Sequence, residues 1–314
     1  MGDAAASPLS EHATLTSRAA MASITMALFL LALKLWAAAQ TGSVAMLGSL
    51  ADTALDLLAS GVILWGVRYA AMPADRHHRF GHGKAEALAA LFQVMVISIS
   101  AMAILWRAVE RMVEGHVTAN AEYGIGVSVI AMAATGVLLA YQRYVIRRTG
   151  SVAIGADHVH YQSDVLLNGA VIVALALDQY AGIGWADPVF GVGIALALMW
   201  GAWRASSNAV DQLMDREWPE AKRQQFLAAA AKYPELAGLH DLRTRTSGAQ
   251  DFVQFHVWVD PALTVRAAHD ALDRVEEKLE AEFPGTEILI HLDPRGNTDR
   301  EGVLPAELAE ESPI

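Results

Sequence analysis

Long apolar stretches, separated by short polar connections, dominate the first two thirds of the chain. Six of them follow one another, at about residues 17–39, 43–70, 83–112, 122–145, 150–178 and 184–208. A helix that crosses a bilayer needs about 20 mostly apolar residues. Gly and Ala are frequent here, as is typical where membrane helices pack closely. The pattern predicts a membrane all-α bundle of six transmembrane helices over residues 17–208, preceded by a tail of residues 1–16.

The last third of the chain has shorter, alternating patterns. A helix is predicted from Pro219 to about Lys232, and the following elements are strands at 239–246 and 252–259, a helix at 265–283 and a strand at 287–292. This order predicts a C-terminal αββαβ domain over residues 209–296, an α+β unit of ferredoxin-like or metallochaperone-like type. Residues 297–314 are polar and acidic and are expected to be disordered.

The charge distribution supports the same division. The chain has 314 residues, a net charge of −11, and only 18% charged residues. Residues 1–208 hold 13 acidic and 12 basic residues, whereas residues 209–314 hold 21 acidic and 11 basic ones. We therefore place the domain boundary near Asp211. The acidic balance argues against nucleic acid as a partner.

Basic residues predict the orientation, because they gather on the cytoplasmic side of membrane helices. They cluster at the second and fourth connections, which carry Arg68, Arg76, Arg79, Lys84, Arg143, Arg147 and Arg148. The first and fifth connections carry no Lys or Arg. Arg107 and Arg111 run against this pattern. The N-terminus lacks the basic region and cleavage site of a signal peptide. Both termini are predicted to lie in the cytoplasm.

Ionisable residues lie near the middle of two of the predicted spans. Asp52 and Asp56 are four residues apart on the second span, as are His160 and Asp164 on the fifth. Residues i and i+4 share one face of a helix. Each pair lies about ten residues, or roughly 15 Å, into its span, which is half the hydrocarbon thickness. Three carboxylates and one imidazole suffice for a tetrahedral zinc site, so we expect the pairs to meet near the midplane.

The alternative is that the two pairs are separate polar contacts that hold the bundle together. Paired acids without nearby bases fit that interpretation poorly, because buried like charges repel. Lys34 on the first span could neutralise one of these acids, but it is expected instead to snorkel to the outer surface, which is close to it. The chain has no Cys, which excludes thiolate metal sites and leaves His and Asp as the plausible zinc ligands.

Two further sets of metal-type residues lie outside the spans. The connection between the second and third spans carries Asp75, His77, His78 and His82. A solvated polar loop explains this set equally well. The C-terminal domain carries His240, His256, His269, His291 and Asp293, and the sequence alone does not show that these converge.

Taken together, these segments resemble the cation diffusion facilitators, in particular the bacterial zinc and ferrous-iron efflux pumps. The resemblance covers about residues 15–296 and rests on five stretches: 52–56, 73–84, 160–164, 240–245 and 291–294. Two departures concern Leu292, where relatives usually carry Gln, and His158, which is expected to face away from His160. His12 and His116 belong to no motif.

The resemblance implies roles for these residues. Asp52, Asp56, His160 and Asp164 match an intramembrane transport site, and Asp75, His78 and His82 match a loop site in which His77 is no ligand. His240, His256, His269, His291 and Asp293 match a binuclear zinc site in the cytoplasmic domain. Such pumps are homodimers, and Lys84 and Asp215 match a charge pair that ties the dimer together at the membrane surface.

The combined expectation is a secondary transporter, not an enzyme, in the bacterial inner membrane. It exports Zn²⁺ in exchange for protons, because metal and protons compete for the same ligands. Fe²⁺, Cd²⁺ and Mn²⁺ remain alternative substrates, since affinity order does not fix selectivity. A channel or a membrane metal sensor without proton coupling is a second alternative. A membrane metalloenzyme would need a motif such as His-Glu-x-x-His, which the chain lacks.

Overall fold

The fold is taken from a computed structural model, which describes residues 8–41, 44–114, 122–181 and 186–295. The chain divides into two compact units. The helical unit is His12–Val210, and the C-terminal unit comprises the described residues 211–295 together with residues 8–11. The predicted disordered tail, residues 297–314, lies outside the described residues.

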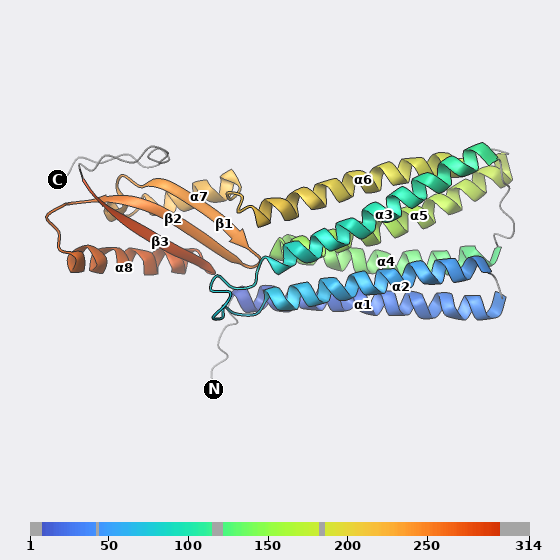
Figure 1. The fold of residues 1–314 in the computed structure, drawn as a ribbon, viewed down its shortest axis with the longest axis horizontal. Helices are drawn as coiled ribbons and strands as arrows, with labels where there is room; N and C mark the ends of the chain where they lie inside the picture. Colours follow the sequence, from blue (N-terminus) through green and yellow to red (C-terminus); the bar gives the residue numbers. More distant parts are fainter. Residues whose placement is uncertain (1–7, 42–43, 115–121, 182–185, 296–314) are drawn as a thin grey trace, which may run out of the picture. The chain divides into compact units, whose positions relative to one another are not determined.

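The helical unit consists of long helices that run alongside one another (Figure 1). They are α1 (Pro8–Thr41), α2 (Val44–Ala70), α3 (Ala85–Glu114), α4 (Glu122–Thr149), α5 (Val152–Ala181) and α6 (Ala186–Leu213). These helices confirm the predicted six-helix part. The predicted tail of residues 1–16 differs, because α1 already begins at Pro8.

Four helices are long and apolar enough to cross a membrane, judged over the described residues. The qualifying stretches are Leu9–Trp36, Ala85–Glu110, Val129–Thr149 and Pro188–Leu213. The other two predicted spans are α2 and α5. Helices α2 and α5 are likewise mostly apolar. The side chains at 44–52 of α2 and at several positions of 171–181 in α5 lie outside those that the structure describes.

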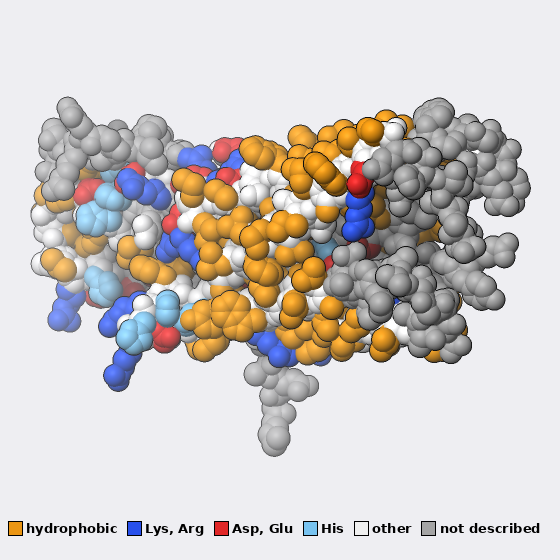
Figure 2. All heavy atoms as spheres, turned by 45° about the vertical axis from the view of Figure 1, so that its right-hand side comes forward, with side chains coloured by type: hydrophobic (Ala, Val, Ile, Leu, Met, Phe, Trp, Pro, Cys, Tyr) orange, Lys and Arg blue, Asp and Glu red, His pale blue; other side chains and the backbone are white. Residues whose placement is uncertain are grey.

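Apolar side chains cover the outside of the helical unit, while its interior is built from small residues. Figure 2 shows hydrophobic side chains over much of the visible face. The side chains of Trp36, Trp106 and Trp203 are exposed. An apolar surface of this extent marks contact with a membrane. Inside, alanines such as Ala89 and Ala153 are fully or almost fully buried. Small residues let helix backbones approach closely, which is how membrane helices associate.

The C-terminal unit is a three-stranded sheet with helices packed on one face. Its elements are α7 (Glu220–Ala230), a short 3₁₀ turn (Pro234–Leu236), β1 (His240–Ser247), β2 (Gln250–Val259), α8 (Val265–Glu282) and β3 (Thr286–Pro294). The strand order is β1-β2-β3, antiparallel between β1 and β2 and parallel between β2 and β3. The predicted αββαβ order is confirmed.

The two faces of β2 have different roles. Val253, Phe255 and Val257 belong to one buried core together with residues of α7 and α8, such as Phe226 and Leu279. Because side chains alternate along a strand, His256 and Trp258 point to the opposite face. The helices therefore cover one face of the sheet and leave the histidine-bearing face open.

The close approach of α2 and α3 generates a test of the packing. A methyl group added at Gly66 would overlap Cβ of Ala89, whereas one added at Gly61 on the same helix would meet nothing within 4 Å. Gly66→Ala is expected to lower the free energy of unfolding by about 1–3 kcal/mol, because overpacking forces the helices apart. Gly61→Ala, the matched control, is expected to be neutral or stabilising by up to about 1 kcal/mol. Thermal unfolding in detergent measures both, and equal melting temperatures would contradict the packing.

Candidate metal centres

Three groups of metal-type side chains form in the part of the chain that the structure describes. They are Asp56, His160 and Asp164 (the α2–α5 group), Asp75, His78 and His82 (the loop group), and His240, His256 and Asp293 (the sheet group). Within each group, one ligand atom from every residue lies within 4.8 Å of the others. All three contain only nitrogen and oxygen donors, which suit zinc and related divalent ions.

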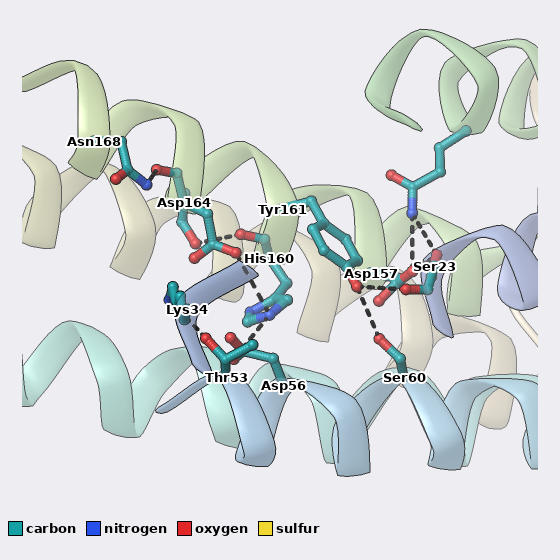
Figure 3. A network of polar contacts seen from close by, with 12 residues as sticks. Ser23, Lys34, Thr53, Asp56, Ser60, Asp157, His160, Tyr161, Asp164 and Asn168 are labelled. Atoms are coloured by element: carbon teal, nitrogen blue, oxygen red, sulfur yellow. Dashed lines mark hydrogen bonds and ion pairs between the residues drawn. The ribbon is translucent and has the colours of Figure 1, made fainter. Parts of the chain in front are cut away.

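The α2–α5 group joins side chains of two neighbouring helices (Figure 3). Nε2 of His160 lies 3.2 Å from Oδ1 of Asp56 and 4.0 Å from Oδ2 of Asp164. His160 is 4% exposed, so its imidazole is held away from solvent. The side chain of Asp52 lies outside the described residues. Three of the four predicted ligands are therefore brought together, on the helix faces that the i, i+4 spacing predicts.

The immediate surroundings of this group involve both its backbone and its side chains. The Asn168 amide donates a 2.7 Å hydrogen bond to the backbone carbonyl of Asp164, and the Ser163 hydroxyl donates to that of His160. The Tyr161 ring meets the His160 ring edge-on, with the centroids 5.3 Å apart, and so packs against this ligand.

Lys34 differs from the prediction that it snorkels to the outer surface. Its Nζ donates a 2.6 Å hydrogen bond to Oγ1 of Thr53 on α2, next to the α2–α5 group (Figure 3). The prediction was wrong because it considered only the distance of Lys34 from the helix end. A hydroxyl acceptor and the nearby carboxylates make the inward direction more favourable for an ammonium group.

The loop group lies in the connection between α2 and α3. Asp75 Oδ2 lies 3.4 Å from His82 Nε2, and Asp75 Oδ1 lies 3.4 Å from His78 Nδ1. The backbone N–H groups of His78 and His77 donate to Asp75 and lower the pKa of its carboxyl. His82 is buried, whereas Asp75 and His78 are exposed. His77 contributes its backbone and is not part of the group, in line with the expected loop site.

The sheet group is assembled by strand register. Cα pairing places His240 on β1 and His291 on β3 opposite His256 on β2, and Asp293 opposite Trp258. Asp293 Oδ2 lies 2.7 Å from His256 Nδ1 and 3.3 Å from His240 Nε2. The ring centroids of His291 and His256 are 4.6 Å apart. Four of the five predicted residues therefore form one row on the open face of the sheet.

His269 is the predicted member that this row does not include. It lies in the first turns of α8 and is exposed. Helix α8 packs through Leu272, Val275 and Leu279 into the core on the other face of the sheet. Trp258, which stacks on His240 with centroids 4.5 Å apart, covers part of the histidine row instead.

Two buried carboxylates near these groups were missed by the sequence interpretation. Asp241, at φ 47°, follows His240 within a register shift, and its Oδ2 lies 3.7 Å from His256 Nε2. Arg243 holds this carboxylate with contacts of 3.1 Å to both oxygens. Asp157 on α5 is fully buried, three residues before His160. Asp157 lies three residues before His160 and seven before Asp164, a helical spacing that could have marked it. Asp241 gives no such signal, since long-range packing brings it to His256.

The sequence comparisons agree with this geometry. Residues 20–214 match the family described as cation efflux transmembrane domain, and residues 218–295 match the cytoplasmic domain of cation efflux proteins. The chain belongs to the cation efflux family, the cation diffusion facilitators. Members of this family are transporters and not enzymes, so the protein is a membrane transporter for cation efflux.

Individual relatives cover nearly the whole chain. The cation-efflux pumps FieF of Salmonella newport (strain SL254) and Salmonella typhimurium (strain LT2) are 43% identical over 293 residues, which is 93% of this chain and 97% of each relative. A solved structure of CzrB in its zinc form is 30% identical, with a TM-score of 0.25, and the match covers 27% of this chain and 99% of that chain.

The contacts of Asp293 predict how the metal-free C-terminal unit responds to acid. Burial alone would raise the pKa of this carboxyl, but the hydrogen bond from His256 and the nearby imidazoles lower it below its ordinary value. The stabilisation is complete above about pH 3.9, the ordinary carboxyl pKa, and is lost as pH falls through the lowered pKa. Asp293→Asn should remove the acid-dependent part of the stability and lower the free energy of unfolding by about 1.5–3 kcal/mol at neutral pH.

Tryptophan fluorescence during urea unfolding of the full chain, in detergent with a chelator, measures this effect at a series of pH values. Asp260→Asn is the matched control, because Asp260 is exposed and bonds only the neighbouring backbone N–H of Ala262 among the contacts described. If stability falls with decreasing pH in the same way in Asp293→Asn and in the unmodified protein, the assigned contacts of Asp293 are contradicted.

Proposed function

We propose that this protein exports a divalent metal ion, zinc before others, across the bacterial inner membrane in exchange for protons. The observation that carries the proposal is the α2–α5 group, in which an imidazole and two carboxylates from two apolar helices converge. Asp52 joins them as the fourth ligand in this proposal, because it precedes Asp56 by one helical turn on α2. Ionisable groups inside a membrane bundle are costly and mark transport pathways.

Competition between protons and metal supports exchange as the mechanism. A metal ion requires neutral His160 and ionised carboxylates, so binding displaces protons from the group. An ordinary imidazole titrates near pH 6.5, between the pH of the cytoplasm and that of an acidic exterior. A group that opens alternately to the two sides then loads metal from the cytoplasm and releases it outside when protons return.

The donor set favours zinc without excluding related ions. His160 in place of a fourth carboxylate suits zinc better than manganese, because manganese prefers oxygen donors. The relatives named FieF are cation-efflux pumps, and that description fixes no single metal. Fe²⁺, Cd²⁺ and Mn²⁺ are therefore the competing substrates.

The other two groups have supporting roles in this proposal. The loop group binds metal at the cytoplasmic ends of α2 and α3. The sheet group, with His291 and His269, binds structural or regulatory zinc in the cytoplasmic domain. The chemistry fits, since His256, His240 and Asp293 present nitrogen and oxygen donors within the range of one ion.

We further propose that the protein works as a homodimer with both termini in the cytoplasm. Lys84 and Asp215 form a charge pair between protomers at the membrane surface in this arrangement. Within the C-terminal unit, Asp215 already lies 3.4 Å from Arg245. This contact positions the carboxylate of Asp215. The backbone of Asp215 has a φ of 55°, which is uncommon for a residue other than glycine. Zinc in the cytoplasmic domains counters the repulsion between two acidic units.

Removing one ligand tests the transport site. His160→Ala is expected to lower zinc flux by at least about 100-fold, because even changes outside the ligand set cost 10–100-fold in metal affinity. His77→Ala is the matched control, since His77 is exposed and lies outside the three groups. Zinc uptake into reconstituted vesicles gives the flux, and gel filtration checks the oligomeric state. Unchanged flux in His160→Ala would remove the assignment.

Vesicles that contain both a zinc-sensitive and a pH-sensitive dye test the exchange. Zinc movement in one direction is expected to drive proton movement in the other, with both absent in His160→Ala. Zinc uptake without proton movement would identify a channel. Zinc binding without any flux would identify a membrane sensor.

A further inference from the structure

A second buried polar cluster lies on α5, beside the α2–α5 group but separate from it (Figure 3). Its centre is Asp157, which is 0% exposed and three residues nearer than His160 to the beginning of the helix. Three residues correspond to nearly one helical turn. The proposed transport function, on which the following inference rests, assigns no role to this carboxyl group.

The hydrogen bonds of Asp157 are all made by one oxygen. Oδ2 accepts a 2.5 Å hydrogen bond from the Ser23 hydroxyl on α1 and a 2.8 Å hydrogen bond from the Gln142 amide on α4. Oδ1 is buried and has no hydrogen-bond partner among the described residues. Oδ1 is therefore the oxygen that can take up a proton without displacing an existing hydrogen bond.

Gln142 and its neighbours fix the direction of these hydrogen bonds. The Gln142 amide nitrogen also lies 3.0 Å from the Ser23 hydroxyl, and its carbonyl oxygen lies 3.3 Å from Nδ1 of His158. The Tyr161 hydroxyl donates a 2.9 Å hydrogen bond to the backbone carbonyl of Ser23. The amide and hydroxyl donors of the cluster are thus directed to Asp157 by contacts with three helices.

The charges around Asp157 do not compensate an ionised carboxylate. Helices α1 and α4 direct only the neutral groups of Ser23 and Gln142 at it. The ionisable groups that interact with it electrostatically are His160, Tyr161 and Asp164 on α5 and Asp56 on α2. No Lys or Arg forms an ion pair with Asp157 among the described residues. An uncompensated charge in such a position is costly, so the neutral acid is favoured when the α2–α5 group is without metal.

We propose that Asp157 is a proton-binding site of the transporter, distinct from the metal ligands. It carries its proton on Oδ1 while the α2–α5 group is without metal. A divalent cation bound one turn away favours the ionised carboxylate, so the O–H bond breaks and the proton leaves to water on the side to which the group is open. Metal release reverses the step, and a proton from the other side reforms the O–H bond. Each cycle therefore moves a proton that no metal ligand holds.

The variant Asp157→Asn separates this role from a structural one. Its side-chain carbonyl still accepts from Ser23 and Gln142, while the amide occupies the place of the O–H group and does not titrate. Simultaneous zinc and pH measurements in vesicles give the number of protons exchanged per metal ion. We expect this ratio to fall by about one in Asp157→Asn, with zinc affinity, measured by isothermal titration, changed by less than about threefold.

Ser60→Ala is the matched control. It removes a neutral buried hydroxyl from the same cluster, 3.2 Å from the Tyr161 hydroxyl, without touching Asp157. Damage to the cluster slows flux in this variant but leaves the proton-to-metal ratio unchanged. A ratio in Asp157→Asn equal to that of the unmodified protein would overturn the proposal for Asp157 alone. An unmodified protein that moves zinc without protons would overturn it together with the proposed exchange.

Ser23→Ala provides a second test if Asp157→Asn does not assemble. Loss of the Ser23 hydroxyl destabilises the ionised form of Asp157 more than its neutral form, because hydrogen bonds to charged acceptors are stronger. The pH midpoint of proton-coupled zinc transport should therefore shift to higher pH. A midpoint that does not move would contradict a titrating Asp157.

Discussion

The burial of ionisable side chains between apolar helices is the constraint that organises the helical unit. A carboxylate or imidazole inside such a bundle must be paired, hydrogen-bonded or neutral, because no solvent compensates it. Asp56, His160 and Asp164 meet this condition by converging, and Asp157 meets it through the donors of Ser23 and Gln142. Both arrangements require α1, α2, α4 and α5 to be placed accurately, so helix packing and site chemistry depend on each other.

In the C-terminal unit, strand register and not helix packing brings the polar side chains together. Its histidine row exists because β1, β2 and β3 are in a register that puts His240, His256 and His291 opposite one another. A shift of one residue in β2 would turn His256 into the core. The core residues Val253, Phe255 and Val257 prevent this, since they would then become exposed. The hydrophobic face of the strand thereby specifies the geometry of its polar face.

Local patterns were enough to predict the elements and the α2–α5 group, whereas the loop group and the sheet group were expected only from the family resemblance. Apolar length predicted the helices, strand alternation predicted β2, and the i, i+4 spacing placed His160 with Asp164. Long-range packing decided the rest. The direction of Lys34 depends on Thr53 of another helix, and Asp241 approaches His256 only because of the register shift after His240. Asp157 lies at helical spacing from His160 and Asp164, but its contacts with Ser23 and Gln142 become visible only when α1 and α4 are in place.

The contact between Gly66 and Ala89 has a consequence for motion. At this point α2 and α3 are separated by too little space for even one more methyl group, so the two helices cannot roll over each other there. They behave as a single stiff hairpin, with the loop group at its bend and Asp56 on one arm. Any rearrangement that opens the space around Asp56 must therefore displace the hairpin as a whole. Glycine at position 66 thus permits the close contact between α2 and α3.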